Sequence, residues 1–192
     1  MTLQQISTEA SWVIAASQAN FLLLLKLMGI LWAVNVVNWL LFHSAFNGLG
    51  IRPRKVIGLP GIWLNPIFHG DFNHLFFNSI PLFILANLMM LEGMTRFTEI
   101  SMYIISISGF IIWLVGRRGI HIGASTLIMG YFGYLLAAAY YKPSILGIML
   151  AGVSLYYFAG LLLGLFPSEE RVSWEGHFAG FCTGIGVAYY FL

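Results

Sequence analysis

The chain has 192 residues, of which 59% are hydrophobic and only 8% are charged, with a net charge of +2. A soluble domain is roughly a quarter charged, so this composition excludes an ordinary water-facing surface, and lipid is the expected solvent for most of the chain. The small net charge gives no indication of a nucleic-acid partner, and the single cysteine, Cys182, excludes an internal disulfide or a Cys-x-x-Cys site.

A helix that spans a membrane needs about 20 mostly apolar residues, because its backbone must satisfy its own hydrogen bonds in lipid. The sequence predicts an all-α membrane protein with one domain over residues 1–192 and a short N-terminal segment over residues 1–20. Six spans are predicted, at residues 21–42, 75–91, 100–115, 124–141, 145–166 and 178–192.

Two of the predicted connections are more than short turns. Residues 43–74 form a long loop that is too apolar for a free linker, and we expect it to fold against the membrane surface or partly into it. Residues 164–176 form the last loop, which holds the most charged part of the chain. At the end of the second predicted span, Glu92 is expected to be a solvated or helix-capping carboxylate that pairs with Arg96, four residues later.

Basic residues lie mostly in the connections between predicted spans one and two, three and four, and five and six. The positive-inside rule, applied alone, would therefore place the N-terminus outside the cell.

Several polar residues lie in or beside the predicted spans, where ionisable groups are costly and tend to mark function. Taken alone, each has an ordinary explanation, since a membrane serine usually packs as a small residue and a single histidine at a helix start is often interfacial. Counting spans, however, places three of them near one membrane face. These three are His74, Ser125 and His177. The full set of polar residues in or beside the spans is His69, His74, Asn78, Glu92, Ser125 and His177.

The spacing within two predicted spans favours a common site. His74 and Asn78 are four residues apart and therefore share a helix face. Gly176, Gly180 and Gly184 also repeat every four residues, which lets a neighbouring helix approach closely. If that neighbour is the fourth predicted span, Ser125 and His177 can act as a nucleophile and its base.

Three classes of intramembrane protease can be compared with these residues. The zinc type needs a His-Glu-x-x-His motif, which is absent, and the aspartyl type needs two aspartates, whereas the chain has only Asp71. The serine type is left, as a dyad without a carboxylate and with no metal or cofactor. An alternative is a small transporter or a metal or haem protein, although its histidines show no regular ligand spacing: His43, His69, His74, His121 and His177.

On these residues the chain resembles the rhomboid intramembrane serine proteases, and it is similar to the bacterial GlpG type in a short form without a soluble N-terminal domain. Three motifs in chain order carry the resemblance: His-x-x-x-Asn, Gly-x-Ser and His-x-x-Gly-x-x-x-Gly. They match His74 and Asn78, Gly123 and Ser125, and His177, Gly180 and Gly184, with the small residue Gly130 five positions after the serine. The chain departs from the family pattern at Thr126, which replaces a glycine, at Met129, where relatives often have an aromatic residue, and at Trp63, which has no arginine beside it.

The resemblance implies a six-helix rhomboid bundle that cleaves transmembrane segments of other proteins. It implies that Ser125 is the nucleophile, that His177 is the general base and acid, and that His74, Asn78 and the Ser125 backbone N–H form the oxyanion hole. It also implies a bacterial inner-membrane protein with both termini in the cytoplasm, opposite to the charge rule, and a site near the periplasm. A catalytically inactive relative that binds transmembrane helices is the alternative, and the oligomeric state is left open.

Overall fold

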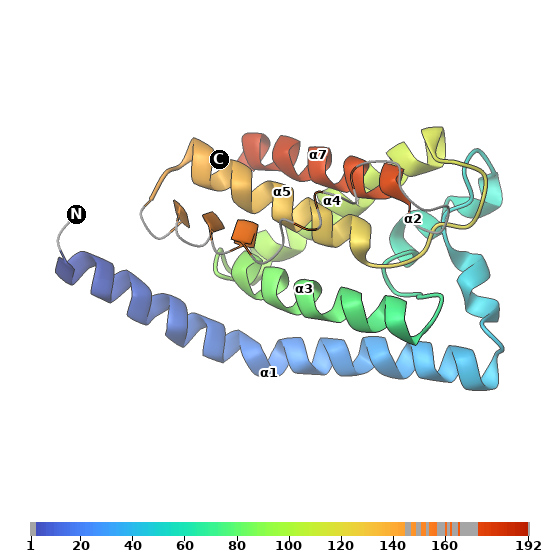
Figure 1. The fold of residues 1–192 in the computed structure, drawn as a ribbon, viewed down its shortest axis with the longest axis horizontal. Coiled ribbons are helices and arrows are strands. Elements are labelled where there is room, and N and C mark those ends of the chain that lie inside the picture. The colour runs from blue at the N-terminus through green and yellow to red at the C-terminus, as the bar shows by residue number, and fades with distance from the viewer. Residues whose placement is uncertain are drawn as a thin grey trace.

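Long helices lying side by side make up most of the computed structural model, which describes residues 3–144, 147–148, 151–152, 154–156, 160, 162, 165 and 173–191 (Figure 1). Within these residues the extended pairing is limited to one antiparallel bridge between Ile51 and His121. The long helices are α1 (Leu3–Leu41), α3 (Phe72–Met90), α4 (Met94–Val115), α5 (Ser125–Tyr141) and α7 (Trp174–Phe191).

Five of the six predicted spans coincide with these helices, and the predicted span at 145–166 lies largely outside the described residues. The largest difference is in α1, which begins at Leu3 rather than at residue 21. Glutamine, serine and threonine lower the hydropathy of residues 3–20, but alanine and glutamine favour a helix. The helix therefore begins before the apolar run does. Among the residues that the structure describes, three helices are long and apolar enough to cross a membrane: Ser7–Leu41, Phe72–Met90 and Met94–Val115.

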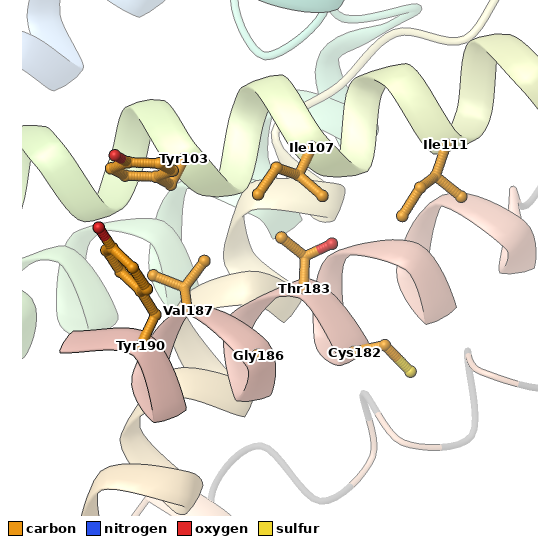
Figure 2. A pocket seen from close by; sticks show the side chains of 8 residues that line it. All are labelled: Tyr103, Ile107, Ile111, Cys182, Thr183, Gly186, Val187 and Tyr190. Carbon is orange, nitrogen blue, oxygen red and sulfur yellow. The ribbon is translucent and has the colours of Figure 1, made fainter. Parts of the chain in front are cut away.

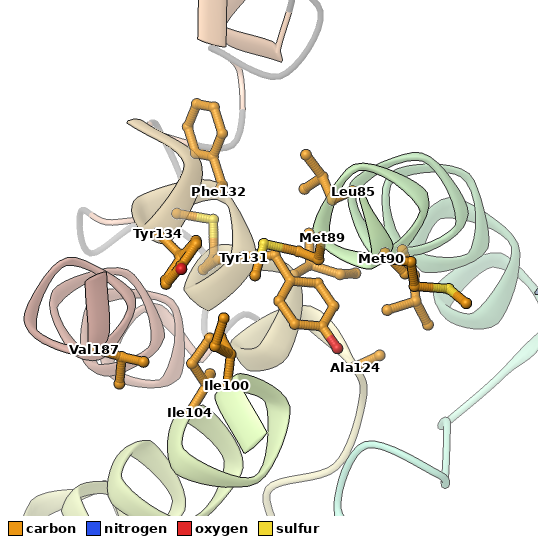
Figure 3. Packing of buried hydrophobic residues seen from close by; sticks show 14 of the residues in the cluster. Leu85, Met89, Met90, Ile100, Ile104, Ala124, Tyr131, Phe132, Tyr134 and Val187 are labelled. Atoms are coloured by element: carbon orange, nitrogen blue, oxygen red, sulfur yellow. The ribbon is translucent and has the colours of Figure 1, made fainter. Parts of the chain in front are cut away.

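Helix α5 lies at the centre of the bundle. Residues on every side of it are buried, including Ile128, Phe132 and Tyr134, and a helix that is apolar all round belongs in the interior. Side chains of α3 and α4, among them Leu85 and Ile104, complete the core around it (Figure 3).

Helices α5 and α7 touch through their backbones at glycines. A Cβ atom added at Gly180 would overlap the carbonyl oxygen of Thr126, and one at Gly184 would overlap the carbonyl oxygen of Gly130. A Cβ at Gly133 would likewise overlap the carbonyl oxygen of Phe181. The glycine face of α7 therefore packs against α5, the fourth predicted span.

The long loop before α3 is folded onto α4. It contains two 3₁₀ turns, η1 (Ala45–Leu49) and η2 (Val56–Gly58), and the short helix α2 (Gly61–Leu64). Trp63 Nε1 donates to Ser106 Oγ over 3.1 Å, and Trp113 Nε1 donates to the Lys55 carbonyl over 2.9 Å. These contacts make the loop a packed part of the fold.

The predicted pairing of Glu92 with Arg96 is wrong. The Glu92 carboxylate accepts hydrogen bonds from the Tyr134 hydroxyl at 3.1 and 3.0 Å, whereas Arg96 lies 3.7 Å from the carboxylate of Glu99. Glu92 lies in the turn between α3 and α4, so the four-residue spacing of a continuous helix does not apply to it.

Candidate active site

The turn that precedes α5 is held by the long loop. Ser125 is the first residue of α5, and Gly123 has a φ of 114°, in the left-handed region that favours glycine. The Gly123 N–H donates to the Asn65 carbonyl over 2.8 Å, and the Ala124 N–H donates to His69 Nε2 over 3.3 Å. The Ser125 N–H, at the start of a helix, has no acceptor within that helix.

His74 and Asn78 border the same turn from α3. A Cβ atom at Gly123 would lie 2.6 Å from His74 Nε2, so only glycine lets His74 approach this closely, and 3.5 Å from Asn78 Nδ2, an ordinary contact distance. Within the described part of the chain, the buried Asn78 Nδ2 has no hydrogen-bond acceptor. An amide N–H beside the turn is thus available to a ligand.

The tautomer of His74 follows from its surroundings. The Asp71 carboxylate caps α3 by accepting from the His74 backbone N–H over 2.9 Å, which fixes the start of the helix. The Gly70 N–H donates to His74 Nδ1 over 3.5 Å. Because Nδ1 accepts, the ring proton is assigned to Nε2, the nitrogen that faces Gly123.

His69 is fully buried beside His74, with the two rings edge to face at a centroid distance of 5.0 Å. Its backbone is held by α1, because the His69 N–H donates to Asn35 Oδ1 over 2.8 Å and Trp39 Nε1 donates to the His69 carbonyl over 3.0 Å. Burial, with His74 nearby, lowers the pKa of His69 to about 4. The neutral ring can therefore accept from Ala124.

Sequence reasoning included His69 among the costly polar residues but missed its bond to the turn. The usable signal was a costly polar residue within an apolar loop.

In the chain, Ser125 lies between Ala124, which bonds to the loop before α3, and Thr126, which contacts the start of α7. Both Ser125 and His177 are half-buried, and His177 lies in the first turn of α7, where its N–H donates to the Ser173 carbonyl over 3.1 Å. A Cβ atom at Gly176 would lie 2.9 Å from Thr126 Oγ1. The residue after Ser125 thus touches the residue before His177.

Figure 1 shows the N-terminal ends of α3, α5 and α7 at the same end of the bundle. His74, Ser125 and His177 lie in the first turns of these three helices. The structure therefore gathers the helix turns that carry the predicted site at one end of the molecule.

Met129 and Gly130 shape the packing directly behind this site. Met129 is almost fully buried, and its Cβ would lie 3.3 Å from a Cβ placed at Gly180, on the turn of α7 after His177. The Gly130 carbonyl oxygen lies against Gly184, so a side chain at Gly184 would force α5 and α7 apart, whereas one at Gly130 would overlap Ile104 of α4. These residues set the spacing of the two helices.

A polar clasp joins the connection before α5 to the start of α7. Arg117 Nε forms an ion pair with Glu175 Oε1, and His121 Nδ1 lies 2.9 Å from Ser173 Oγ. His121 Nε2 also lies 3.0 Å from the Arg117 carbonyl oxygen. Of the predicted last loop at 164–176, the described residues are 165 and 173–176, and the clasp holds its end.

A metal site was the alternative use for the histidines. Across the residues that the structure describes, no three histidine, cysteine, aspartate or glutamate side chains are grouped so that they could hold a metal ion. The rings of His69 and His74 are adjacent, but His69 Nε2 and His74 Nδ1 each accept from a backbone N–H of the chain.

Comparison with known proteins gives one family. A family model described as the Rhomboid domain matches residues 60–192. An uncharacterised protein of Mycobacterium bovis and one of Mycobacterium tuberculosis are each 33% identical over 194 aligned positions, covering 96% of this chain and 78% of theirs. An uncharacterised protein of Mycobacterium leprae is 35% identical over 178 positions, covering 86% of this chain and 69% of its own length.

Proposed function

The chain belongs to the rhomboid family, and from this premise we propose that it is an active intramembrane serine endopeptidase with Ser125 as its nucleophile. The rhomboid domain is that of an intramembrane protease family, and three helices in the described part of the chain can cross a membrane, so the chain is an integral membrane protein. A multi-pass topology in a bacterial inner membrane, in the short form similar to the GlpG type, is part of the proposal.

One observation carries the proposal: His74 Nε2 and Asn78 Nδ2 both border Gly123, two residues before Ser125. Attack on a peptide carbonyl places negative charge on its oxygen, and N–H donors fixed in advance around that oxygen lower the barrier. The backbone N–H of Ser125, at the positive end of the α5 dipole, adds a third donor. These three groups form the proposed oxyanion hole.

His177 supplies proton transfer in this scheme. The Ser125 Oγ bonds to the carbonyl carbon as its proton passes to His177, and the carbonyl oxygen becomes an oxyanion. The C–N bond then breaks and the proton passes from His177 to the leaving amine, which leaves an ester on Ser125. Water, deprotonated by His177, attacks this ester and releases the new carboxylate and the serine hydroxyl.

Packing takes the place of a third catalytic residue. Gly180 and Gly184 bring the backbone of α7 onto α5, and Thr126 meets Gly176 one residue from each proposed catalytic group. An imidazole carried on such a closely packed helix has few orientations, so a dyad can work without a carboxylate behind the histidine.

The substrate class follows from the site's location. The proposed site lies at the ends of α3, α5 and α7, near one membrane face, where water can reach it and where the end of another protein's transmembrane segment can enter. In the family orientation that face is periplasmic.

Cleavage of a transmembrane reporter by purified protein in liposomes tests the proposal. Ser125→Ala and His177→Ala should each abolish cleavage, a chelator should not, and the matched Ser11→Ala, at an exposed position of α1, should leave it unchanged. A fluorophosphonate probe should label the protein and fail to label Ser125→Ala. Persisting cleavage in Ser125→Ala contradicts the mechanism, and a folded protein that neither cleaves nor reacts supports the alternative, an inactive relative that binds transmembrane helices.

A further inference from the structure

A groove of about 590 Å³ runs between α4 and α7 (Figure 2). One wall comes from α4 and the other from α7, and each wall is a row of residues spaced four apart, as along one helix face. The rows are Tyr103, Ile107 and Ile111 on α4, and Cys182, Gly186 and Tyr190 on α7. Because α4 can cross a membrane and α7 packs along it, the groove opens toward lipid.

The groove is separate from the proposed catalytic site. Gly180 and Gly184 face α5, whereas Cys182 and Gly186 are exposed on another face of α7. The body of α7 therefore lies between the groove and α5.

Thr183 provides a polar group inside this apolar groove. Its side chain is only 6% exposed, and its Oγ1 has no hydrogen-bond partner within the described residues. Figure 2 shows the hydroxyl directed toward α4, between Ile107 and Ile111. A buried hydroxyl without a partner costs free energy, and an acceptor placed in the groove would remove that cost.

Two serine hydroxyls on the facing helix α4 behave differently. Ser101 and Ser108 of α4 donate to the carbonyl four residues earlier, at 2.6 and 2.5 Å, which is the usual solution for a hydroxyl in a membrane helix. Thr183 does not use that solution, and its buried hydroxyl faces α4, so an acceptor has to enter between α4 and α7 to reach it.

We propose that the groove binds a transmembrane helix of a partner membrane protein, one that carries small residues and a serine, threonine, asparagine or glutamine at mid-membrane depth. No atom of the described residues lies within 4 Å of a Cβ placed at Gly186, so a partner backbone can approach there, and Cys182 and Gly186 form a small-x-x-x-small pair. The Thr183 hydroxyl then gains its acceptor from the partner's polar side chain.

Two other occupants fit less well. Thr183 lies nine residues after Trp174, about 13 Å along α7, a depth at which a lipid acyl chain has no hydrogen-bond acceptor. A second copy of this chain that docked through the same face would place its own groove against this groove, and neither would be filled. Because α7 separates the groove from α5, the bound helix is a partner that is retained rather than a segment in position for cleavage.

Cys182 makes the test direct, because it is the only cysteine in the chain and it lines the groove. The full chain in liposomes is mixed with leucine-rich transmembrane peptides that carry one cysteine, either with a Gly-x-x-x-Gly pair and a central serine or with leucine at all three positions. After mild oxidation, the disulfide product with Cys182 should be about fivefold or more higher for the glycine–serine peptide.

Variants separate the groove from general membrane collisions. Gly186→Leu should reduce this crosslink to the level of the all-leucine peptide, and Thr183→Val should reduce it about threefold or more, while Thr183→Ser retains it. Gly29→Leu, at an exposed glycine of α1 that also has open space around it, is the matched control and should change nothing. A thermal melt of each variant establishes that it is folded.

Three results would overturn the proposal: equal crosslinking of both peptides, no effect of Gly186→Leu, or a Cys182–Cys182 dimer as the main product. The first indicates a surface that lipid fills, and the last indicates a second copy. The crosslink requires no catalysis and should persist in Ser125→Ala, so its failure is distinguishable from failure of the proposed protease activity.

Discussion

The backbone N–H of Ala124 donates a hydrogen bond to Nε2 of His69, 3.3 Å away, and so joins the turn before Ser125 to the loop before α3. The neighbouring Gly123 N–H donates to the Asn65 carbonyl of the same loop. Two successive N–H groups are thereby occupied, which fixes the backbone that presents Ser125.

His69→Asn should lower both stability and the rate of reporter cleavage. The shorter side chain cannot reach Ala124, and a buried N–H left without an acceptor costs about 1–3 kcal/mol. Thermal melting in detergent and the initial cleavage rate measure the two effects. His43→Asn is the matched control, because His43 is exposed with a φ of 48°, which asparagine tolerates. An unchanged melt and rate in His69→Asn would show that the turn does not depend on this bond.

The same histidine predicts a loss of stability in mild acid. Its pKa is lowered from 6.5 to about 4 in the folded protein, so between these pH values the unfolded chain binds a proton that the folded chain does not. The contribution of His69 is therefore complete above pH 6.5 and falls, by about 3 kcal/mol in total, as the pH drops toward 4. The free energy of unfolding in mixed micelles at pH 7 and 4.5 should fall less in His69→Asn than in the parent chain, and equal falls would count against this assignment.

The fold was predictable where the physical cause is local. Apolar runs located α3, α5 and α7 to within four residues at each end and α4 to within six, because lipid demands apolar side chains and internally bonded backbone. The start of α1 was not predictable in this way, because polar residues before an apolar run can extend its helix toward the N-terminus.

The candidate site was predictable only in part. The spacing of His74 and Asn78 predicted a shared helix face, and both side chains do border Gly123. The bond between His69 and Ala124 joins segments far apart in the chain, and nothing in local sequence encodes that meeting. The partner of Glu92 was missed for a related reason, because Tyr134 lies on a different helix.

Gly180→Ala should destabilise the protein by about 1–3 kcal/mol and should slow cleavage more than it weakens substrate binding. Its Cβ would overlap the Thr126 carbonyl, so α5 and α7 must separate and the Ser125 to His177 geometry changes with them. Unfolding and separate kcat and KM measurements check this. Gly186→Ala on the same helix meets open space and should behave like the parent chain. If Gly180→Ala and Gly186→Ala have the same stability and the same kinetic constants, close packing of α7 on α5 is unimportant.

His74→Ala and Asn78→Ala should each reduce kcat by about 10²–10³-fold with a smaller change in KM, because the proposed donors act on charge that develops in the transition state. Fluorophosphonate labelling should slow in parallel. Asn73→Ala, an exposed position in the first turn of α3, is the control and should retain full activity. A change confined to KM would reassign these side chains to substrate binding.

The hydrogen bonds between α1 and His69 bear on where the functional unit begins. Asn35 and Trp39 hold the backbone of His69, yet both precede residue 60, where the family match starts. A fragment cut at that boundary would keep each proposed catalytic side chain and lose the scaffold beneath the Gly123 turn. A fragment made for expression or for fusion to another protein must therefore include α1 together with the matched domain.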